Sequence, residues 1–453
     1  MATPSQSGKQ IRTSAQMTTQ EKLLSILVIG FSYRPLNNPR SFRWSHLTEQ
    51  FAKLGHRVDV VTSWVPGMDE IEQDGLLTIY RVGWKKIERL RARQRDSRSQ
   101  AGTGTASAKS PFGVLRGMLL GAVILTWRAI HWPDAACLWY FPARTKALLL
   151  AKAHQYDVIV SVAPPFTAVL VGRYVRNRCK GPAWILDLGD PFSFLEGAPP
   201  NNRALYGRLN ETYERAAFRE ADGVSVTNPQ TMERYEAFIP ESKGKIRVIP
   251  PLLSMPPLYA SAAPVSGRLV YVGTLYRHIR EPTFLLELFT RVCRDDQDGK
   301  MELHFLGDVS ACIDILGRYQ ERLGKRLCVH GLVSREKVAE AMGEADILIN
   351  IGNDTTYQLP SKVVEYAASG KPVVNIAKTE QDSSVRFFSS FPYALNLITH
   401  DGMPSDSHVS RFSDFIRHPP ERASRSLLDA WLAPYGSDSV VGDYLDLLRR
   451  RRG

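Results

Sequence analysis

Short apolar segments recur along the chain in a pattern that is typical of parallel β-sheets. In the first half, seven such segments are rich in β-branched residues and are apolar nearly throughout, rather than alternating between apolar and polar residues. They begin at Leu23, Arg57, Leu76, Tyr156, Ala183, Asp222 and Ile246. Strands that are buried on both faces have this composition, whereas strands with one solvent-exposed face alternate between apolar and polar residues. The pattern therefore predicts a parallel sheet that is covered on both sides.

The same alternation of strand and helix occurs a second time. Five further predicted strands begin at Leu269, Met301, Arg326, Asp346 and Pro372, after a loop rich in Pro, Ser and Ala that starts at Pro251. Helical segments separate the strands in both halves. The first of them is predicted to follow Asn38 as N-cap and Pro39 as first helical residue, and to end at Gly55.

Two doubly wound α/β domains, each Rossmann-like, are the economical interpretation. We expect a disordered lead-in over residues 1–20, a first domain over 21–255 with an insertion at 84–132, and a second domain over 256–420. A C-terminal helical segment, 421–453, should pack back on the first domain. Ligands of such sheets bind at the carboxyl ends of the strands, so the cleft between two facing domains is the expected site.

The positive charge of the chain is concentrated in the insertion. The 453 residues contain 58 Lys and Arg against 46 Asp and Glu, a net charge of +12. Residues 84–111 hold eight of the basic residues and two acidic ones, and an apolar run from Gly117 to Leu125 follows. This composition suits a surface that docks on anionic lipid, but a solvated loop followed by a buried core helix fits about equally well. The run is too short to cross a bilayer.

Several other classes of protein lack support in the sequence. No nucleic-acid motif accompanies the basic residues, so nucleic acid is not an expected partner. The polar N-terminus has no secretory apolar core, and the five cysteines lack zinc-type spacing, which together favour a reducing, cytoplasmic location. A peripheral position on the inner face of a membrane is compatible with this expectation. Phosphate-loop, zinc-protease, serine-hydrolase and G-x-G-x-x-G motifs are missing. Asp296 and Asp298 have a metal-ligand spacing, but they lie in a polar turn.

Two loops that follow predicted strands carry groups suited to anions or hydroxyls. Asn37, Asn38 and Arg40 follow the first strand, where a capped turn is an equally good interpretation. In the second domain, Arg277 and Arg280 follow Gly273 and offer charge to a diphosphate, with a solvated basic turn as the alternative.

The most specific segment is LPSKVVEYAASGKPVV, residues 359–374. Ser361 is predicted to be the N-cap of a helix that Gly370 ends. Glu365 lies about one turn in, where the helix dipole favours its ionised form, and a carboxylate there can accept two hydrogen bonds from a vicinal diol. A glutamate in this position is more often only a helix-stabilising charge.

These segments together resemble the family-4 glycosyltransferases of the GT-B fold, and the likeness extends over residues 22–450. The resemblance rests on the segment 359–374, on GTLY at residues 273–276, and on similarity of WPD (132–134), YDVIVSVAPPFTA (156–168) and the LDLGDPFSF segment to members of bacterial polysaccharide assembly. It implies a nucleotide-sugar donor held by the second domain, an acceptor held by the first, and transfer with retention of the anomeric configuration.

The resemblance also assigns residues. Donor contacts would come from Gly273, Thr274, Arg277, Arg280, Val333, Tyr357, Ser361, Lys362 and Glu365, and acceptor contacts from Asn37, Asn38, Arg40 and Asp190. Asp190, Arg277 and Lys362 would act in catalysis, because cations can neutralise the leaving diphosphate. No metal or other cofactor is then required.

The sequence departs from the family at two positions. Tyr357 stands where a first motif glutamate is usual, eight residues before Glu365, and Gly189 stands where the most similar relatives have Arg between Asp187 and Asp190. Two other functions therefore stay open: a sugar-nucleotide epimerase of the same fold, and a catalytically silent subunit that only binds nucleotide sugars. The acceptor would be a glycan or a lipid-linked glycan.

Overall fold

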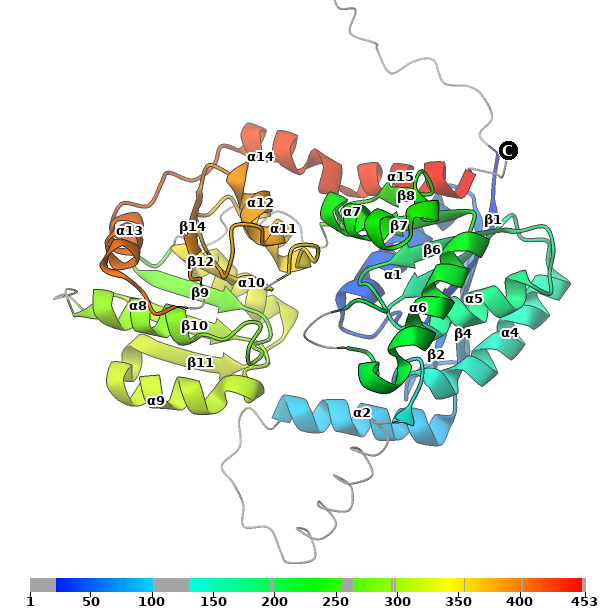
Figure 1. The fold of residues 1–453 in the computed structure, drawn as a ribbon, viewed down its shortest axis with the longest axis horizontal. Helices are drawn as coiled ribbons and strands as arrows, with labels where there is room; N and C mark the ends of the chain where they lie inside the picture. The colour runs from blue at the N-terminus through cyan, green and yellow to red at the C-terminus, as the bar shows by residue number, and fades with distance from the viewer. Residues whose placement is uncertain are drawn as a thin grey trace, which may run out of the picture.

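The computed structural model describes residues 22–100, 130–195, 199–253, 264–294, 296, 299–353, 355–400 and 402–449, with the backbone alone at 93–100 and 361. These residues form two α/β domains side by side, each built on its own sheet (Figure 1). The predicted lead-in over 1–20, the boundary at 255 and the apolar run from Gly117 lie outside the described residues.

The sheet of the first domain has eight strands. In spatial order they are β3 (Ile71–Asp74), β4 (Leu77–Val82), β2 (Arg57–Ser63), β1 (Ser25–Gly30), β5 (Val158–Ala163), β6 (Ala183–Leu188), β7 (Gly223–Val226) and β8 (Ile246–Val248). All neighbours pair in parallel except β3, which pairs antiparallel with β4. In register, Val28 of β1 lies between Val60 of β2 and Val160 of β5.

The sheet of the second domain has six strands, all parallel. Their spatial order is β11 (Leu327–Gly331), β10 (Glu302–Leu306), β9 (Arg268–Val272), β12 (Ile347–Ile351), β13 (Val373–Ala377) and β14 (Ala394–Ile398). The predicted pair of doubly wound parallel sheets is confirmed. Two strands were missing from the prediction, β3 and β14, which are edge strands with partly exposed residues and so lack a continuous apolar run.

Helices cover both sheets. In the first domain they are α1 (Pro39–Lys53), α2 (Lys85–Gln100), α4 (Tyr140–Ala153), α5 (Thr167–Arg176), α6 (Arg203–Glu220) and α7 (Pro229–Phe238). In the second they are α8 (Thr283–Cys293), α9 (Ile313–Leu323), α10 (Arg335–Glu344), α11 (Ser361–Ala368), α12 (Ser383–Ser389) and α13 (Asp406–Arg417), and α14 (Arg425–Leu432) and α15 (Ser437–Arg449) complete the chain. Short 3₁₀ turns occupy Cys137–Trp139, Pro240–Ser242, Ser310–Cys312, Gly324–Arg326 and Ala433–Tyr435.

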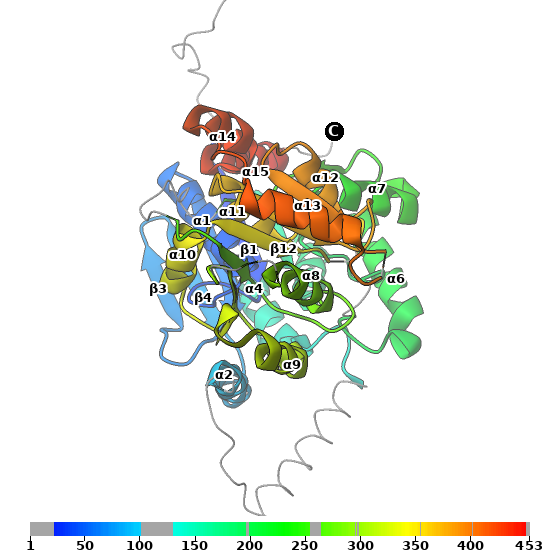
Figure 2. The same cartoon turned by 90° about the vertical axis from the view of Figure 1, so that its left-hand side faces the viewer.

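Each sheet is sandwiched between two apolar layers. In the second domain, α8, α9 and α13 pack on one face, and α10, α11, α12 and α14 pack on the other (Figure 2). In the first domain, α4, α5, α6 and α7 cover one face and α1 covers the other. The prediction for α1 is confirmed: the Asn38 side chain accepts from the backbone N–H of Ser41, and Pro39 is the first helical residue.

The C-terminal helices join the two domains. α14 contacts α11 of the second domain, whereas α15 packs against α1 and contributes Val440, Tyr444 and Leu448 to the core of the first. The two helices run across the top of the molecule (Figure 1). Burial of the apolar side chains of α15 stabilises the packing of this C-terminal helix against the first domain.

The basic part of the insertion forms α2, which lies along the lower side of the first domain (Figure 1). It is held there by Arg91, which donates to the carbonyl of Ala135 at 2.6 Å, and by Trp84, whose indole donates to the carbonyl of Leu138 at 3.2 Å. Across the described residues, no helix has the length and apolar character that spanning a bilayer requires.

Candidate active site

Loops that follow the strands of the two sheets meet between the domains. The loop after β12, residues 352–360, reaches the first domain: the Tyr357 hydroxyl donates to the Phe194 carbonyl at 3.1 Å, and the Gln358 amide donates to the Asp190 carboxylate at 2.6 Å. Because both sheets are parallel, these loops lie at the carboxyl ends of their strands, where doubly wound domains bind ligands. The predicted donor and acceptor sides therefore adjoin.

On the first domain, Arg40 and Asp187 form a buried ion pair at the end of β6. Nη1 of Arg40 donates to Oδ2 of Asp187 at 2.7 Å, and the Arg40 side chain is 14% exposed. Asp187 also accepts from the Trp44 indole and from the hydroxyls of Ser225 and Tyr444, each at 2.7 Å. Burial raises the pKa of Asp187, but Arg40 and the hydrogen bonds from Tyr444 and Trp44 outweigh it, so the pKa lies below its ordinary value.

Asp190 lines a pocket of about 400 Å³ at the ends of β1, β5 and β6. Its other charged lining residues are Arg91 of α2 and the buried Asp134. The remaining walls are apolar: Phe31, Ala135, Ala136, Ala163, Pro164, Pro165, Phe166, Leu188, Pro191, Phe192, Leu195 and Pro200. The rings of Phe166 and Phe192 stack with centroids 3.9 Å apart. A pocket with apolar walls and few charges suits a ligand with an apolar part beside a polar one.

Glu214 of α6 fixes the loop that carries Asp190. Its buried carboxylate accepts from the backbone N–H groups of Phe192 and Ser193, both at 3.0 Å, and from the Tyr235 hydroxyl at 2.8 Å. Burial raises the pKa of Glu214 above its ordinary value, although these hydrogen bonds oppose the shift. Sequence analysis missed this residue, because nothing in the pattern of α6 distinguishes Glu214 from its solvent-facing neighbours.

The other predicted acceptor residues have simpler roles in the structure. Asn38 caps α1, as described above, and its side-chain oxygen is occupied by the N–H of Ser41. Asn37 is exposed beside it. Of the three residues predicted from this loop, Arg40 is the one that the structure brings beside Asp190, through its position over Gly189.

On the second domain, the turn after β9 is built on a close backbone approach. Gly273 has a φ of +137°, and a Cβ on Gly307 would lie 2.3 Å from the Gly273 carbonyl oxygen. Such geometry requires glycine. The Tyr271 hydroxyl donates to the Thr274 carbonyl at 3.1 Å and so fixes the turn.

Lys362, from the first turn of α11, lies against this turn. Its ammonium is 4.2 Å from the centroid of the Tyr271 ring and donates to the Val272 carbonyl at 3.3 Å. A Cβ on Gly273 would lie 3.4 Å from it. Burial, with a smaller contribution from the charge of Arg280, holds the pKa of Lys362 well below its ordinary value. Two basic side chains, Lys362 and Arg280, thus lie at the end of β9.

The two predicted arginines differ in their surroundings. Arg280 is partly buried and its Nε donates to the Asn353 side chain at 2.5 Å, which links the turn after β9 to the loop after β12. Arg277 is exposed at the surface and pairs with Asp314 at 2.5 Å, while its Nε donates to the Ala311 carbonyl. The structure therefore groups Arg280, and not Arg277, with Lys362.

Glu365 is linked to the first domain through Arg335, the first residue of α10. A guanidinium nitrogen of Arg335 lies 3.8 Å from the Glu365 carboxylate, and the guanidinium lies 4.1 Å from the centroid of the Phe42 ring in α1. Val333, just before α10, is partly buried against the core of the second domain. Arg335 was not among the predicted residues, because its position between the domains is set by tertiary packing.

One detail of the predicted motif needs correction. Ser361 is the first residue of α11 and Pro360 occupies the N-cap position, without a side-chain capping bond, so the helix begins one residue away from the prediction. Gly370 follows the end of α11 with a φ of +67°, as expected. The next residue, Lys371, is buried and donates to the Gly343 carbonyl at 2.7 Å, so the second lysine of the segment holds the end of α10.

Tyr357 lies in the core of the first domain, although it belongs to the second. It is 3% exposed, its ring contacts that of Phe194 at 5.6 Å, and its carbonyl accepts from the Asn228 side chain at 3.0 Å and from the Thr231 hydroxyl. Its neighbour Gln358 makes the contact with Asp190. No group of three His, Cys, Asp or Glu side chains suited to a metal ion is found among the residues described.

Family models match both halves of the chain. One describes a glycosyl transferase 4-like domain and matches residues 41–251, and the other describes glycosyl transferases group 1 and matches residues 266–383. The chain belongs to the GT-B glycosyltransferases. This confirms the family that the sequence resembles. No curated protein sequence matches the chain significantly.

Solved structures of similar fold cover nearly the whole chain at low identity. Sucrose-phosphate synthase from Thermosynechococcus elongatus has a TM-score of 0.60 at 15% identity, covering 94% of this chain and 98% of its own. A UDP-forming α,α-trehalose-phosphate synthase from Burkholderia vietnamiensis has a TM-score of 0.62 at 12% identity, and the match covers 94% of this chain and 97% of the synthase. HepE from Anabaena, in complex with UDP and glucose, has a TM-score of 0.55 at 12% identity, and the match covers 94% of this chain and 100% of HepE. At identities this low, the similarity shows a shared fold, which is that of the GT-B glycosyltransferases.

Proposed function

We propose that the protein transfers a sugar from a nucleoside diphosphate donor, bound by the second domain, to a glycan or lipid-linked acceptor, bound by the first, as part of polysaccharide assembly. The anomeric configuration of the sugar is retained and no metal or other cofactor takes part. The observation that carries the proposal is the position of two basic side chains, Lys362 and Arg280, at the end of β9, on the side where Gln358 contacts Asp190.

On the donor side, the diphosphate binds beside Gly273 and Thr274, where the turn allows close backbone approach. Lys362 and Arg280 neutralise the charge that develops as the bond between the sugar and the diphosphate breaks. Glu365 accepts hydrogen bonds from the ribose hydroxyls. Arg277 contributes once its exposed ion pair with Asp314 opens, since such pairs contribute little to stability.

On the acceptor side, Asp190 orients the hydroxyl group that attacks the sugar. A bond forms between that oxygen and the anomeric carbon, the bond to the diphosphate breaks, and the proton of the hydroxyl ends on the diphosphate. The apolar pocket beside Asp190 favours an acceptor that carries an apolar group next to its sugar, as a lipid-linked glycan does.

We further propose that α2 holds the protein on the inner face of a membrane, at the cytoplasmic side. Its described side chains include Lys85, Lys86 and Arg89, with Leu90 exposed among them. Each basic residue near an anionic surface is worth about 1 kcal/mol and is screened by salt. Removing residues 85–110 should release the protein from vesicles containing phosphatidylserine at low salt. Equal vesicle binding with and without the segment contradicts the role of α2.

The proposed transfer is tested in two steps. A thermal-shift screen of nucleotide sugars identifies the donor, because a ligand that binds the folded state raises the unfolding midpoint. Product analysis with that donor then follows, over neutral and lipid-linked acceptors. A glycoside product supports transfer. An epimerised donor formed without acceptor indicates an epimerase, and binding without any turnover indicates the silent subunit that the burial of Tyr357 would favour.

A further inference from the structure

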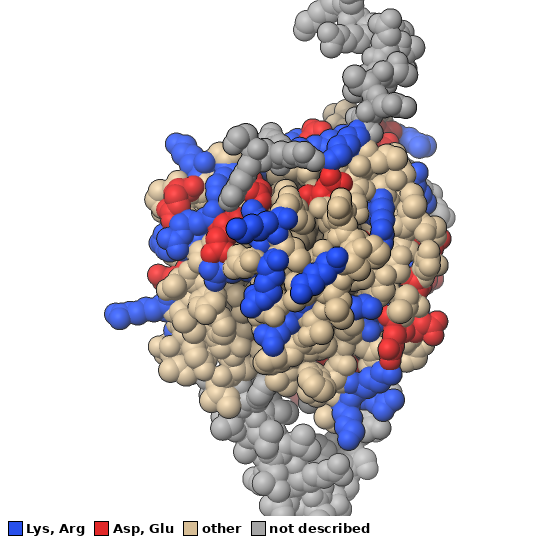
Figure 3. Space-filling view, turned by 90° about the vertical axis from the view of Figure 1, so that its right-hand side faces the viewer, with Lys and Arg blue, Asp and Glu red and all other residues tan. Residues whose placement is uncertain are grey.

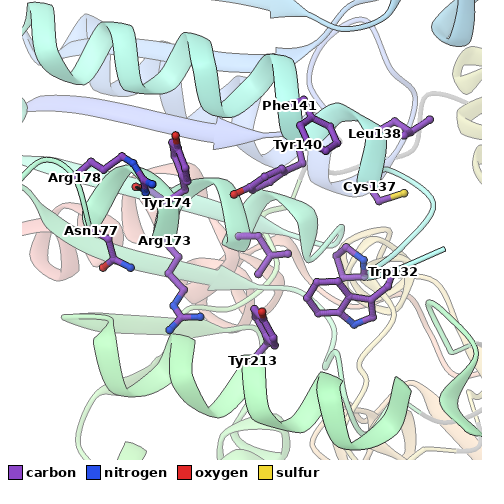
Figure 4. A pocket seen from close by; sticks show the side chains of 12 residues that line it. Trp132, Cys137, Leu138, Tyr140, Phe141, Arg173, Tyr174, Asn177, Arg178 and Tyr213 are labelled. Carbon is purple, nitrogen blue, oxygen red and sulfur yellow. Dashed lines mark hydrogen bonds between the residues drawn. The ribbon is translucent and has the colours of Figure 1, made fainter. Parts of the chain in front are cut away.

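A second pocket lies on the first domain, between α4, α5 and α6, and no part of the proposed transfer uses it. Its volume is about 560 Å³, within the range of small-molecule sites, roughly 300–1,000 Å³. Five aromatic side chains line it: Trp132, Tyr140, Phe141, Tyr174 and Tyr213 (Figure 4). Arg173, Asn177 and Arg178 contribute its main polar groups. The segment 132–138 contributes residues to this pocket and to the one beside Asp190.

The walls of the pocket are fixed in place by contacts with residues outside it and by contacts between lining residues. The Trp132 indole donates to the Asn210 side chain at 2.9 Å, and Trp132 packs edge-on against Tyr213 with ring centroids 4.8 Å apart. Arg173 donates from two nitrogens to the Glu220 carboxylate. The guanidinium carbon of Arg178 lies over the Tyr174 ring, 3.6 Å from the ring centroid. A ligand would enter a pocket that needs little ordering, which lowers the cost of binding.

Several other polar groups of the lining lack hydrogen-bond partners within the described part of the chain, whereas Arg173 and Arg178 have them. The hydroxyls of Tyr140, Tyr174 and Tyr213 and the side-chain amide of Asn177 make no hydrogen bond there. Aromatic faces together with unpaired hydroxyl and amide groups match a molecule that presents C–H groups on one side and hydroxyls around its edge. A pyranose ring has this character.

Two of the three helices around the pocket are basic, whereas α6 carries Glu211, Glu214 and Glu220. α4 and α5 carry Arg144, Lys146, Lys152, Arg173 and Arg176 and no acidic residue. Basic side chains are spread over this outer face of the first domain (Figure 3). The guanidinium carbon of Arg144 is 5.1 Å from the ring centroids of Tyr140, Phe141 and Tyr174, and neither Arg144 nor Arg178 has a carboxylate partner in the described part of the chain. Arginines that lie over aromatic rings and have no carboxylate partner attract an anion.

We propose that this pocket binds a saccharide that carries an anionic group, a carboxylate or a phosphate, at a site separate from the sugar donor. The shape of the pocket supports a saccharide over other anions. Its neighbouring rings meet at steep angles, 67° for Trp132 and Tyr213 and 82° for Tyr140 and Tyr174, so these pairs form a concave wall rather than the parallel slot that a nucleobase fills. A membrane contacts protruding side chains, whereas these line a recess.

Binding of an oligosaccharide panel to the full chain, without any donor, tests the site. The panel contains neutral oligosaccharides and matched ones that carry uronic acids or phosphate groups, and calorimetry measures each. We expect the acidic members to bind more tightly than the neutral ones. Arg178→Ala should weaken acidic binding by about tenfold or more, the value of a charge-assisted hydrogen bond, and Tyr174→Leu should weaken binding of both kinds.

Lys152→Ala is the matched control, because Lys152 is an exposed basic residue in the last turn of α4 and does not line the pocket. It should change binding little, and thermal melts verify that each variant is folded. Affinity for the nucleotide donor should be unchanged in all three, which separates this site from the proposed active site. The proposal is overturned if no panel member binds, or if neutral and acidic members bind equally. It is also overturned if Lys152→Ala weakens the binding of acidic members as much as Arg178→Ala does. Vesicle binding that depends on Arg178, without saccharide binding, identifies the face as a membrane contact.

Discussion

The guanidinium of Arg40 lies where a side chain at residue 189 would begin. A Cβ built on Gly189 would be 1.6 Å from Nη2 of Arg40 and 2.1 Å from its guanidinium carbon. The family resemblance implies an arginine between the two aspartates, where this chain has Gly189. Here a guanidinium reaches the same place from α1, and Asp187 holds it. The absence of a side chain at 189 and the presence of Arg40 are therefore two parts of one arrangement.

The first prediction tests this arrangement with a double-mutant cycle. Gly189→Ala should displace Arg40 and lower the free energy of unfolding by about 1–3 kcal/mol, as overpacking does. Arg40→Ala should be destabilising, since it leaves Asp187 without its ion pair. In the double variant, the alanine at 189 no longer meets Arg40, so its added cost should be small. Urea unfolding of all four proteins measures the coupling. Strictly additive effects would show that the two positions are independent.

The second prediction concerns pH. The pKa of Asp187 is lowered in the folded protein, so the folded state binds fewer protons at this group than the unfolded state does. The stability that it contributes is present above the unfolded pKa and is lost as the pH falls through the folded pKa. Asp187→Asn should cost about 3–5 kcal/mol at pH 7, because it leaves buried Arg40 unpaired. Below the ordinary aspartate pKa the difference from wild type should shrink. A cost independent of pH contradicts the ionised state of Asp187.

Much of the fold followed from the sequence, because buried parallel strands are continuous apolar runs. All twelve predicted strands are present, and the two missed, β3 and β14, lie at sheet edges. The start of α1 was equally predictable, since Asn38 and Pro39 act locally. Local sequence signals were thus sufficient for the buried strands and for the start of α1, whereas α11 begins one residue earlier than predicted.

The site was harder to predict, because it is assembled by contacts between domains. Gln358 and Arg335 reach the first domain through packing that no motif encodes, and Glu214 holds the Asp190 loop from a helix that looks ordinary in sequence. The position of the Tyr357 side chain could not be predicted from the motif. Its place in the motif suggested a donor contact, whereas the structure puts its side chain in the core of the first domain.

The third prediction follows from this burial. Tyr357→Phe removes the hydrogen bond to the Phe194 carbonyl and should cost about 0.5–1.5 kcal/mol. Tyr357→Glu restores the residue type usual in the family, but it places a carboxylate in an apolar core, so it should cost clearly more, on the order of 2–5 kcal/mol. Urea unfolding at pH 7 measures both. A stable Tyr357→Glu protein with altered donor-sugar preference would instead mean that this loop swings out to contact the donor.

The fourth prediction concerns Glu365. Its carboxylate lies 3.8 Å from Arg335 and can accept two hydrogen bonds from ribose hydroxyls. Glu365→Gln keeps the shape but leaves one oxygen and no charge, so donor affinity should fall by about 1–3 kcal/mol, or about tenfold to over a hundredfold. Glu340→Gln is the control, because Glu340 is exposed on α10 and loses the same charge. Calorimetric titration with the identified donor compares them. Equal affinities would remove Glu365 from the donor site.

The fifth prediction links donor binding to a proton. In the protein without donor, burial and the charge of Arg280 hold the pKa of Lys362 well below its ordinary value. A diphosphate beside Lys362 raises that pKa, because a nearby anion favours the charged form. Binding should therefore take up protons when the pH lies between the two values, and donor affinity should weaken as the pH rises through this window. Calorimetry in buffers of different ionisation enthalpy measures the uptake directly.

The Lys362→Met variant should bind donor more weakly and show no proton uptake. The control is Lys371→Met, which removes the buried lysine that donates to the end of α10 and should leave the uptake intact. Wild-type binding without proton uptake, together with full affinity in Lys362→Met, would place the diphosphate away from β9.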